Sequence, residues 1–130
     1  MAILIVEDNP TNGLILRHLV AKAGDCETAV FEDPAEALEA CQSRCFDLVM
    51  VDHMLPGMTG VQFVHRLRTV ENFRETPIVM VTADTSDGLR EEALAAGVTT
   101  FLTKPIEALG FTHLVGRLIA GSNPHSTPPV

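Results

Sequence analysis

The sequence contains no tryptophan, no tyrosine and only three cysteines among its 130 residues. Without Trp and Tyr, the apolar core must consist of aliphatic side chains and the six phenylalanines. Cys26, Cys41 and Cys45 lack the paired spacing of a disulfide framework, and no neighbouring His or Cys pair completes a metal site with them. We therefore expect reduced, partly buried thiols.

Basic residues are also scarce, with nine Lys and Arg against 17 Asp and Glu, and the formal net charge is −8. A domain of this charge is repelled by phosphate backbones, so we expect no nucleic-acid contact by the domain itself. No apolar run approaches the roughly 20 residues of a membrane-spanning helix, and Met1–Val6 lacks the basic flank of a signal peptide. We expect a cytoplasmic domain without membrane contact.

Five short apolar segments alternate with helical patterns along the chain. The expected strands are Ala2–Val6, Glu27–Phe31, Asp47–Val51, Pro77–Val81 and Val98–Leu102. The expected helices run from Pro10 to Gly24, from Pro34 to about Ser43, from about Gly60 to Val70, from a cap at Ser86 or Asp87 to Gly97, and through Phe111, Leu114, Val115 and Leu118. Strict alternation with short connections predicts a parallel sheet with helices on both faces, the doubly wound α/β class.

A polar residue follows four of these strands: Asp8, Asp52, Thr82 and Lys104. The carboxyl ends of parallel strands meet at one edge of a sheet, where open α/β folds bind ligands. Carboxylate oxygens are the ligands that Mg²⁺ prefers, while an ammonium and a hydroxyl can contact phosphoryl oxygens. The four residues therefore indicate a site for a divalent metal and a phosphoryl group.

The segments around these residues occur in a specific order. They are Val6-Glu7-Asp8-Asn9-Pro10, Val51-Asp52-His53-Met54-Leu55-Pro56-Gly57-Met58-Thr59-Gly60, Val81-Thr82-Ala83-Asp84 and Phe101-Leu102-Thr103-Lys104-Pro105. Together they resemble the receiver domain of two-component response regulators, over residues 2 to about 120. The resemblance implies a flavodoxin-like (βα)5 fold with a five-stranded sheet in the order 2-1-3-4-5, which places Asp8 near Asp52. We expect a receiver domain at 1–120 and a flexible, Pro-rich tail or linker at 121–130.

The resemblance also implies roles for the acidic residues. Asp52 would be the phosphoryl acceptor, and its donor would be a phosphohistidine on a histidine kinase or a histidine phosphotransfer protein. Asp8, Asp52 and the backbone carbonyl of Met54 would hold Mg²⁺, with Glu7 acting through water. We expect no enzyme in the usual sense, only a domain that assists its own phosphorylation and dephosphorylation.

The remaining matched residues would neutralise charge and transmit the signal. Lys104 would contact a phosphoryl oxygen, and Pro105 would follow a cis peptide bond. In relatives, the hydroxyl matching Thr82 moves onto the phosphoryl group, and the aromatic matching Phe101 turns from exposed to buried. The sequence has Phe101 where many relatives have Tyr, so its outward position gains no phenolic hydrogen bond.

The first helix carries an apolar residue on its outer side. Its buried stripe is expected to comprise Leu16, Leu19, Val20 and Ala23. Leu14 then points away from the sheet and Ile15 lies on the flank. Single exposed leucines are ordinary. Alternatively, Leu14 and Ile15 form a docking contact for the kinase or phosphotransfer helix, as the corresponding helix does in relatives.

Other functions remain open at this point. A haloacid dehalogenase-type phosphatase also uses Asp, Thr or Ser, Lys and Mg²⁺, but it needs an acid where this chain has Met54. A flavodoxin-like FMN binder would not place Glu7 and Asp8 in its phosphate loop. Within the receiver class, the domain could control an output module in the same polypeptide or act as a stand-alone phosphorelay carrier, and it could form a phosphorylation-dependent homodimer.

Overall fold

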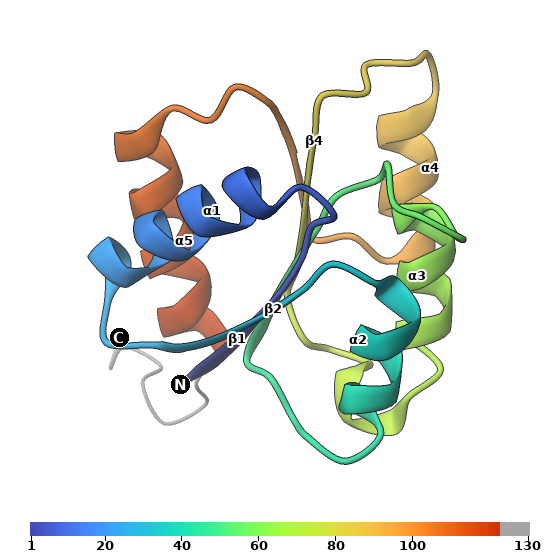
Figure 1. The fold of residues 1–130 in the computed structure, drawn as a ribbon, viewed down its shortest axis with the longest axis horizontal. Helices are drawn as coiled ribbons and strands as arrows, with labels where there is room; N and C mark the ends of the chain where they lie inside the picture. The colour runs from blue at the N-terminus through green and yellow to red at the C-terminus, as the bar shows by residue number, and fades with distance from the viewer. Residues whose placement is uncertain (123–130) are drawn as a thin grey trace.

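The computed structural model of this protein describes residues 1–122, which form one sheet covered by helices on both faces (Figure 1). Five parallel strands lie in the order β2-β1-β3-β4-β5. They are β1 (Ala2–Val6), β2 (Glu27–Phe31), β3 (Leu48–Val51), β4 (Ile78–Thr82) and β5 (Thr100–Thr103). The fold class expected from the sequence and the strand order implied by the resemblance are both confirmed.

The helices divide into two layers (Figure 1). They are α1 (Pro10–Ala23), α2 (Pro34–Cys41), α3 (Gly60–Leu67), α4 (Leu89–Ala96) and α5 (Ala108–Ser122). Figure 1 shows α1 and α5 on one face of the sheet and α2, α3 and α4 on the other. Each layer has its own apolar core, because the central strands β1, β3 and β4 are buried on both faces. Within residues 1–122, no helix combines the length and the apolarity that a membrane span requires.

Helix α1 begins and ends as the sequence predicts. The Asn9 side chain accepts hydrogen bonds from the Thr11 and Asn12 amides, and Pro10 occupies the first helical position. The expected apolar stripe is buried except for Ala23, which is half-buried. On the outer side, Leu14 is 66% exposed and Ile15 is 50% exposed, as expected.

Two helices end earlier than expected. Helix α3 ends at Leu67 rather than Val70, because the Thr69 hydroxyl donates to the Arg66 carbonyl at 2.6 Å and the β-branched pair Thr69-Val70 disfavours another helical turn. A 3-10 turn, Glu71–Phe73, follows. Helix α2 ends at Cys41 rather than Ser43, since the next residues close the helix with tighter bonds to Glu39 and Ala40.

The expected cap of α4 at Ser86 or Asp87 is wrong. The N-cap is Gly88, whose φ of +83° no ordinary side chain favours, and no side chain caps the helix. Ser86 is engaged elsewhere, because both its amide and its hydroxyl donate to the Asp84 carboxylate. Strand β5 starts at Thr100 rather than Val98, since the Val98 amide closes the end of α4 on the Ala93 carbonyl.

The boundary between the expected domain and the expected tail falls inside α5. The helix continues to Ser122, two residues beyond the boundary expected at residue 120. The rest of the expected tail, 123–130, lies outside the described residues.

Candidate functional site

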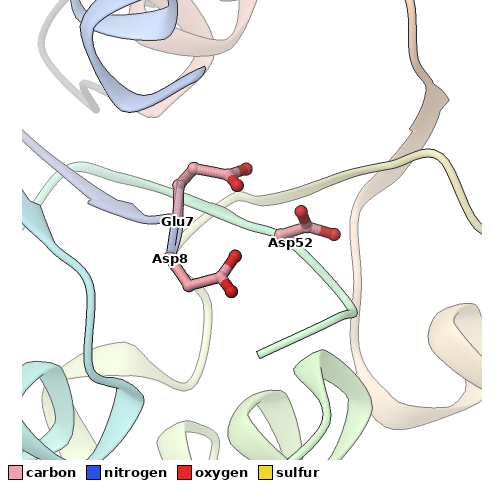
Figure 2. A group of neighbouring side chains, drawn as sticks. All are labelled: Glu7, Asp8 and Asp52. Atoms are coloured by element: carbon pink, nitrogen blue, oxygen red, sulfur yellow. The ribbon is translucent and has the colours of Figure 1, made fainter. Parts of the chain in front are cut away.

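Three acidic side chains meet at the carboxyl edge of the sheet. Glu7 and Asp8 directly follow β1, and Asp52 directly follows β3 (Figure 2). These strands are neighbours with Val6 opposite Val51, and the Asp52 amide extends the ladder by donating to the Val6 carbonyl at 3.0 Å. One carboxylate oxygen from each acid lies within 4.8 Å of the others. Strand pairing therefore brings together residues that lie 45 positions apart in the sequence.

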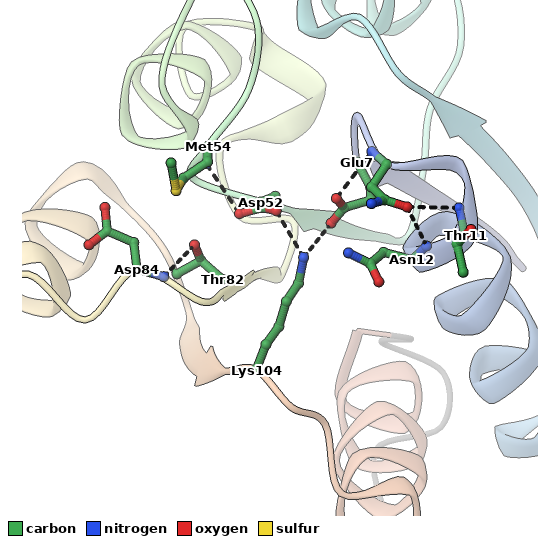
Figure 3. Close-up of polar contacts among 9 residues, drawn as sticks. Glu7, Thr11, Asn12, Asp52, Met54, Thr82, Asp84 and Lys104 are labelled. Atoms are coloured by element: carbon green, nitrogen blue, oxygen red, sulfur yellow. Dashed lines mark hydrogen bonds and ion pairs between the residues drawn. The ribbon is translucent and has the colours of Figure 1, made fainter.

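Lys104 lies between two of these acids. Its Nζ lies 2.9 Å from Glu7 Oε2 and 2.9 Å from Asp52 Oδ2 (Figure 3). Burial alone would lower the pKa of the lysine, but its hydrogen bonds and ion pairs with the two carboxylates outweigh burial and raise that pKa above its usual value. The ammonium therefore stays charged at neutral pH. The Lys104-Pro105 peptide bond is cis, as the resemblance implied.

The two carboxylates that share Lys104 differ in their affinity for a proton. Burial would raise the pKa of Asp52, but hydrogen bonds from Lys104, the Met54 amide and Thr82 outweigh it, so the pKa lies below its usual value. For Glu7, burial dominates over the hydrogen bond from Lys104, and the nearby Asp52 charge adds to it, so the pKa is raised. Asp52 is therefore the carboxylate that the site keeps ionised.

The donor set of this cluster fits a divalent cation. When Glu7, Asp8 and Asp52 are all ionised, they carry three negative charges, and Lys104 compensates one of them. The remaining double negative charge and the carboxylate oxygens match Mg²⁺, a hard cation that prefers oxygen ligands. Glu7 is buried while Asp8 is exposed, so a metal could reach the cluster from the side of Asp8.

A surface cleft opens beside Asp8, the exposed acid of the cluster. It has a volume of about 530 Å³ and is lined by Asp8, His53, Met54, Leu55, Pro56, Thr59 and Asp84. The Met54 side chain is 62% exposed, while its amide donates to Asp52 Oδ1 at 3.1 Å. The cleft is therefore bounded by the loop after β3 and by the loop after β4.

The expected switch residues lie on β4 and β5. Thr82 is fully buried at the end of β4, and its hydroxyl accepts a hydrogen bond from the Asp84 amide at 3.2 Å (Figure 3). Phe101 lies opposite Met80 in the sheet and is half-buried against the core between the sheet and α2, α3 and α4. Its side chain is thus neither fully exposed nor fully buried.

Sequence reasoning missed two contacts near the acids. The Asn9 amide donates to Glu7 Oε1 at 3.3 Å, so the residue that caps α1 also holds the buried acid. Gly60, at the first position of α3, lies directly against the backbone of Asp52 and His53. A glycine at the start of a helix that already has a Thr59 cap was the only signal for this second contact.

Comparison with known proteins finds similarity to response regulators and their receiver domains. Residues 3–115 match the family model described as response regulator receiver domain. The chain is 36% identical over 108 residues to the chemotaxis protein CheY of Pseudomonas aeruginosa, covering 83% of this chain and 87% of that protein. It is 38% identical over 105 residues to the cyclic di-GMP phosphodiesterase response regulator RpfG of Xanthomonas campestris pv. campestris, covering 80% of this chain but 28% of that protein.

A solved structure with the same fold bears on the acidic cluster. The receiver domain of a sensor histidine kinase from Pseudomonas aeruginosa PAO1 superposes with a TM-score of 0.81 at 30% identity, covering 91% of this chain and 96% of that one. In that protein, a magnesium ion is coordinated in the active site cleft.

Proposed function

Because this chain belongs to the family of response regulator receiver domains, we propose that it receives a phosphoryl group from a phosphohistidine partner on Asp52 and transmits the event as a change of conformation. The observation that carries the assignment is the setting of Asp52. It closes the central strand β3, lies inside the acid cluster and accepts hydrogen bonds from Lys104 and the Met54 amide, which favour its ionised form.

Phosphoryl transfer uses Asp52 as a nucleophile. A carboxylate oxygen attacks phosphorus while the bond from phosphorus to the histidine nitrogen breaks, and the nitrogen keeps the electron pair. The product is an acyl phosphate. Lys104 is proposed to turn from Asp52 to a phosphoryl oxygen, because its 2.9 Å contact with the carboxylate lies where the new group forms. The domain assists this reaction on itself and turns over no separate substrate.

Glu7, Asp8, Asp52 and the Met54 carbonyl are proposed to hold Mg²⁺, with Glu7 acting through water. When bound, the ion supplies positive charge to the oxygens of the transferring group. The acid cluster supports this assignment, because its carboxylate oxygens lie within 4.8 Å of one another and would otherwise repel an incoming phosphoryl group. Only the main chain of Met54 is needed, so its exposed apolar side chain does not contradict the proposal.

Thr82 and Phe101 are proposed as the switch. The Thr82 hydroxyl accepts from the Asp84 amide and donates towards Asp52, and it is proposed to redirect its proton to an oxygen of the phosphoryl group. That movement would draw in the loop after β4 and open space for Phe101 to turn further into the core. Support comes from the half-buried position of Phe101 and from the absence of a side-chain cap on α4, within the part of the chain described here.

The partners follow from the same assignment. The donor is proposed to be a histidine kinase or a histidine phosphotransfer protein that docks on α1, where Leu14 and Ile15 are exposed. The chain covers only 28% of RpfG, a longer protein, and this similarity favours an output module in the same polypeptide. It covers 87% of CheY, and that similarity favours a stand-alone carrier. The site of action would be the cytoplasm, and phosphorylation could also drive homodimer formation.

The experiment is labelling with acetyl phosphate, which needs no protein partner. Incubation with acetyl phosphate and Mg²⁺ should add one phosphoryl group, measured by intact-protein mass spectrometry. Chelation of the metal should prevent the addition, and so should Asp52→Ala. If Asp52→Ala gains the group to the same extent as the parent chain, the assignment is wrong.

A further inference from the structure

The first residue of α3 touches the backbone of the proposed phosphoryl acceptor. A methyl group on Gly60 would lie 2.7 Å from His53 Cα and closer still to the Asp52 carbonyl oxygen. Real side chains do not approach backbone atoms this closely, so any larger residue must push α3 and the end of β3 apart. The Gly60 amide also donates to the His53 carbonyl at 2.8 Å, which joins the two segments directly.

The need for glycine here comes from space, not from backbone conformation. Gly57, Gly88 and Gly97 have positive φ values, whereas Gly60 does not. An alanine at the first turn of a helix would ordinarily be favoured over glycine. Gly57, in the same loop, shows the opposite situation, because its φ is +80° and a methyl group there would meet nothing within 4 Å. Glycine at position 60 therefore favours the helix less than alanine would, but it allows the close contact with Asp52 and His53.

Hydrogen bonds fix both ends of the loop that carries Met54. At its start, the Met54 amide donates to Asp52 Oδ1 at 3.1 Å. At its end, the Gly60 amide binds the His53 carbonyl, and a capping box fixes the start of α3 through Thr59 and Gln62, with bonds of 2.9 and 3.1 Å. The loop is thus closed on the residue next to Asp52, and the Met54 carbonyl has little freedom to move relative to the acids.

We propose that Gly60 is a positioning residue for the metal: its missing side chain lets α3 rest on the Asp52–His53 backbone, which holds the Met54 carbonyl in reach of an ion bound by Asp8 and Asp52. The inference rests on the proposed function and deepens it. Gly60 itself touches neither metal nor phosphoryl group. It acts through the main chain of its neighbours, as residues that orient metal ligands commonly do.

The test is Gly60→Ala, assayed by Mg²⁺ titration calorimetry and by hydrogen exchange of the metal-free protein. Mg²⁺ affinity should fall by about tenfold or more. Without metal, the amides of Met54 and Gly60 should exchange faster, while the amides of β1 and β4 should keep their protection. A folded Gly60→Ala protein with unchanged Mg²⁺ affinity and unchanged exchange at Met54 would overturn the proposal.

A matched control separates positioning from helix stability. Val64 lies on the same helix, is fully buried and faces the core rather than Asp52. Val64→Ala should loosen α3 but change Mg²⁺ affinity by no more than about twofold. If Val64→Ala weakens Mg²⁺ binding as much as Gly60→Ala does, Gly60 matters only for helix stability and the proposal fails.

A second variant keeps the test decisive if Gly60→Ala does not fold. Thr59→Ala removes the capping box without adding bulk, and it should weaken Mg²⁺ binding in the same direction but less; unchanged affinity would count against the proposal. Failure of the proposed function would look different. In that case, the parent chain itself would bind no Mg²⁺ or would not be labelled on Asp52, whatever residue occupies position 60.

Discussion

Lys104 determines how charge is distributed among the acids of the site. Its ammonium contacts Glu7 and Asp52 at the same distance of 2.9 Å, yet the two carboxylates respond differently. Asp52 has the Met54 amide and Thr82 as additional donors, so its pKa falls, while for Glu7 burial prevails and its pKa rises. The site therefore keeps Asp52 ionised beside Glu7, a carboxylate that accepts a proton more easily, and this difference fits the role of nucleophile proposed for Asp52.

Replacing Glu7 should stabilise the metal-free protein at neutral pH. The raised pKa means that ionised Glu7 costs stability above that pKa, and the cost disappears as the pH falls through the raised pKa towards the ordinary value of 4.5. Glu7→Gln should therefore unfold at a higher urea concentration than the parent chain at pH 7, and the advantage should shrink to nothing at pH 4. Mg²⁺ affinity should fall, since one acid of the cluster is lost.

The control for Glu7→Gln is Glu39→Gln, which neutralises an exposed acid on α2. That variant should shift neither the urea midpoint nor Mg²⁺ affinity to a comparable degree. Destabilisation by Glu7→Gln at pH 7 without metal would show that the bond from Lys104 outweighs the burial of Glu7, and the raised pKa assigned to Glu7 would be wrong.

Among the helices, α1 joins the site to a surface that a partner can reach. Asn9 both caps the helix and donates to Glu7, while Leu14 extends from the outer side of the same helix. If Leu14 is a docking contact, Leu14→Ala should slow phosphorylation by the cognate phosphohistidine protein by about tenfold, as an interface anchor does. Labelling by acetyl phosphate should stay unchanged. Equal slowing with both donors would mean that Leu14 supports the fold, and the docking role would be dropped.

Arg68 links helices α3 and α4 near the amino ends of β4 and β5, at the end of the sheet opposite to the acids. Its guanidinium donates to the carbonyls of Gly97, Phe73 and Thr76 at 2.5 to 3.2 Å, linking the end of α3 to the end of α4 and to the segment before β4. Arg68→Ala leaves these carbonyls without their donor and should lower the free energy of unfolding by about 2 kcal/mol. Urea denaturation measures the change.

Arg74→Ala is the matched control for Arg68→Ala, because Arg74 is an exposed arginine that directly follows the 3-10 turn. Its effect should stay within about 0.5 kcal/mol. Acetyl phosphate labelling should be retained in both variants, since Arg68 lies at the edge of the sheet away from the acids. Equal urea midpoints for the two variants would contradict the stabilising role assigned to the hydrogen bonds of Arg68.

For the molecule as a whole, the sequence predicts the architecture well but does not predict the contacts between residues that are distant in the sequence. The alternation of apolar runs and helical patterns, with a polar residue after each of four strands, indicates a parallel sheet whose edge carries Asp8, Asp52, Thr82 and Lys104. The apolar and helical patterns are local in the sequence. The four polar residues come together because parallel strands place their carboxyl ends at the same edge of the sheet. The strand order itself came from the resemblance to receiver domains.

What the sequence could not show depends on contacts between distant residues. The carbonyls that Arg68 binds come from three different segments. The close contact between Gly60 and the backbone of Asp52 forms only when α3 packs against the end of β3. The expected cap of α4 failed for a different reason, a local one: Ser86 donates to Asp84, two residues before it, and the helix begins after Gly88. Local propensity does not include such a hydrogen bond.

The central claim is that Asp52 forms an acyl phosphate, and trapping this bond tests the claim most directly. Borohydride reduces an aspartyl phosphate to homoserine, which peptide mass spectrometry can locate. After treatment with acetyl phosphate and Mg²⁺ followed by borohydride, we expect homoserine at position 52, and none when the metal is chelated beforehand. Unmodified Asp52 in a protein that carries the phosphoryl group, or a reduced acid at Glu7 or Asp8 instead, would contradict the account.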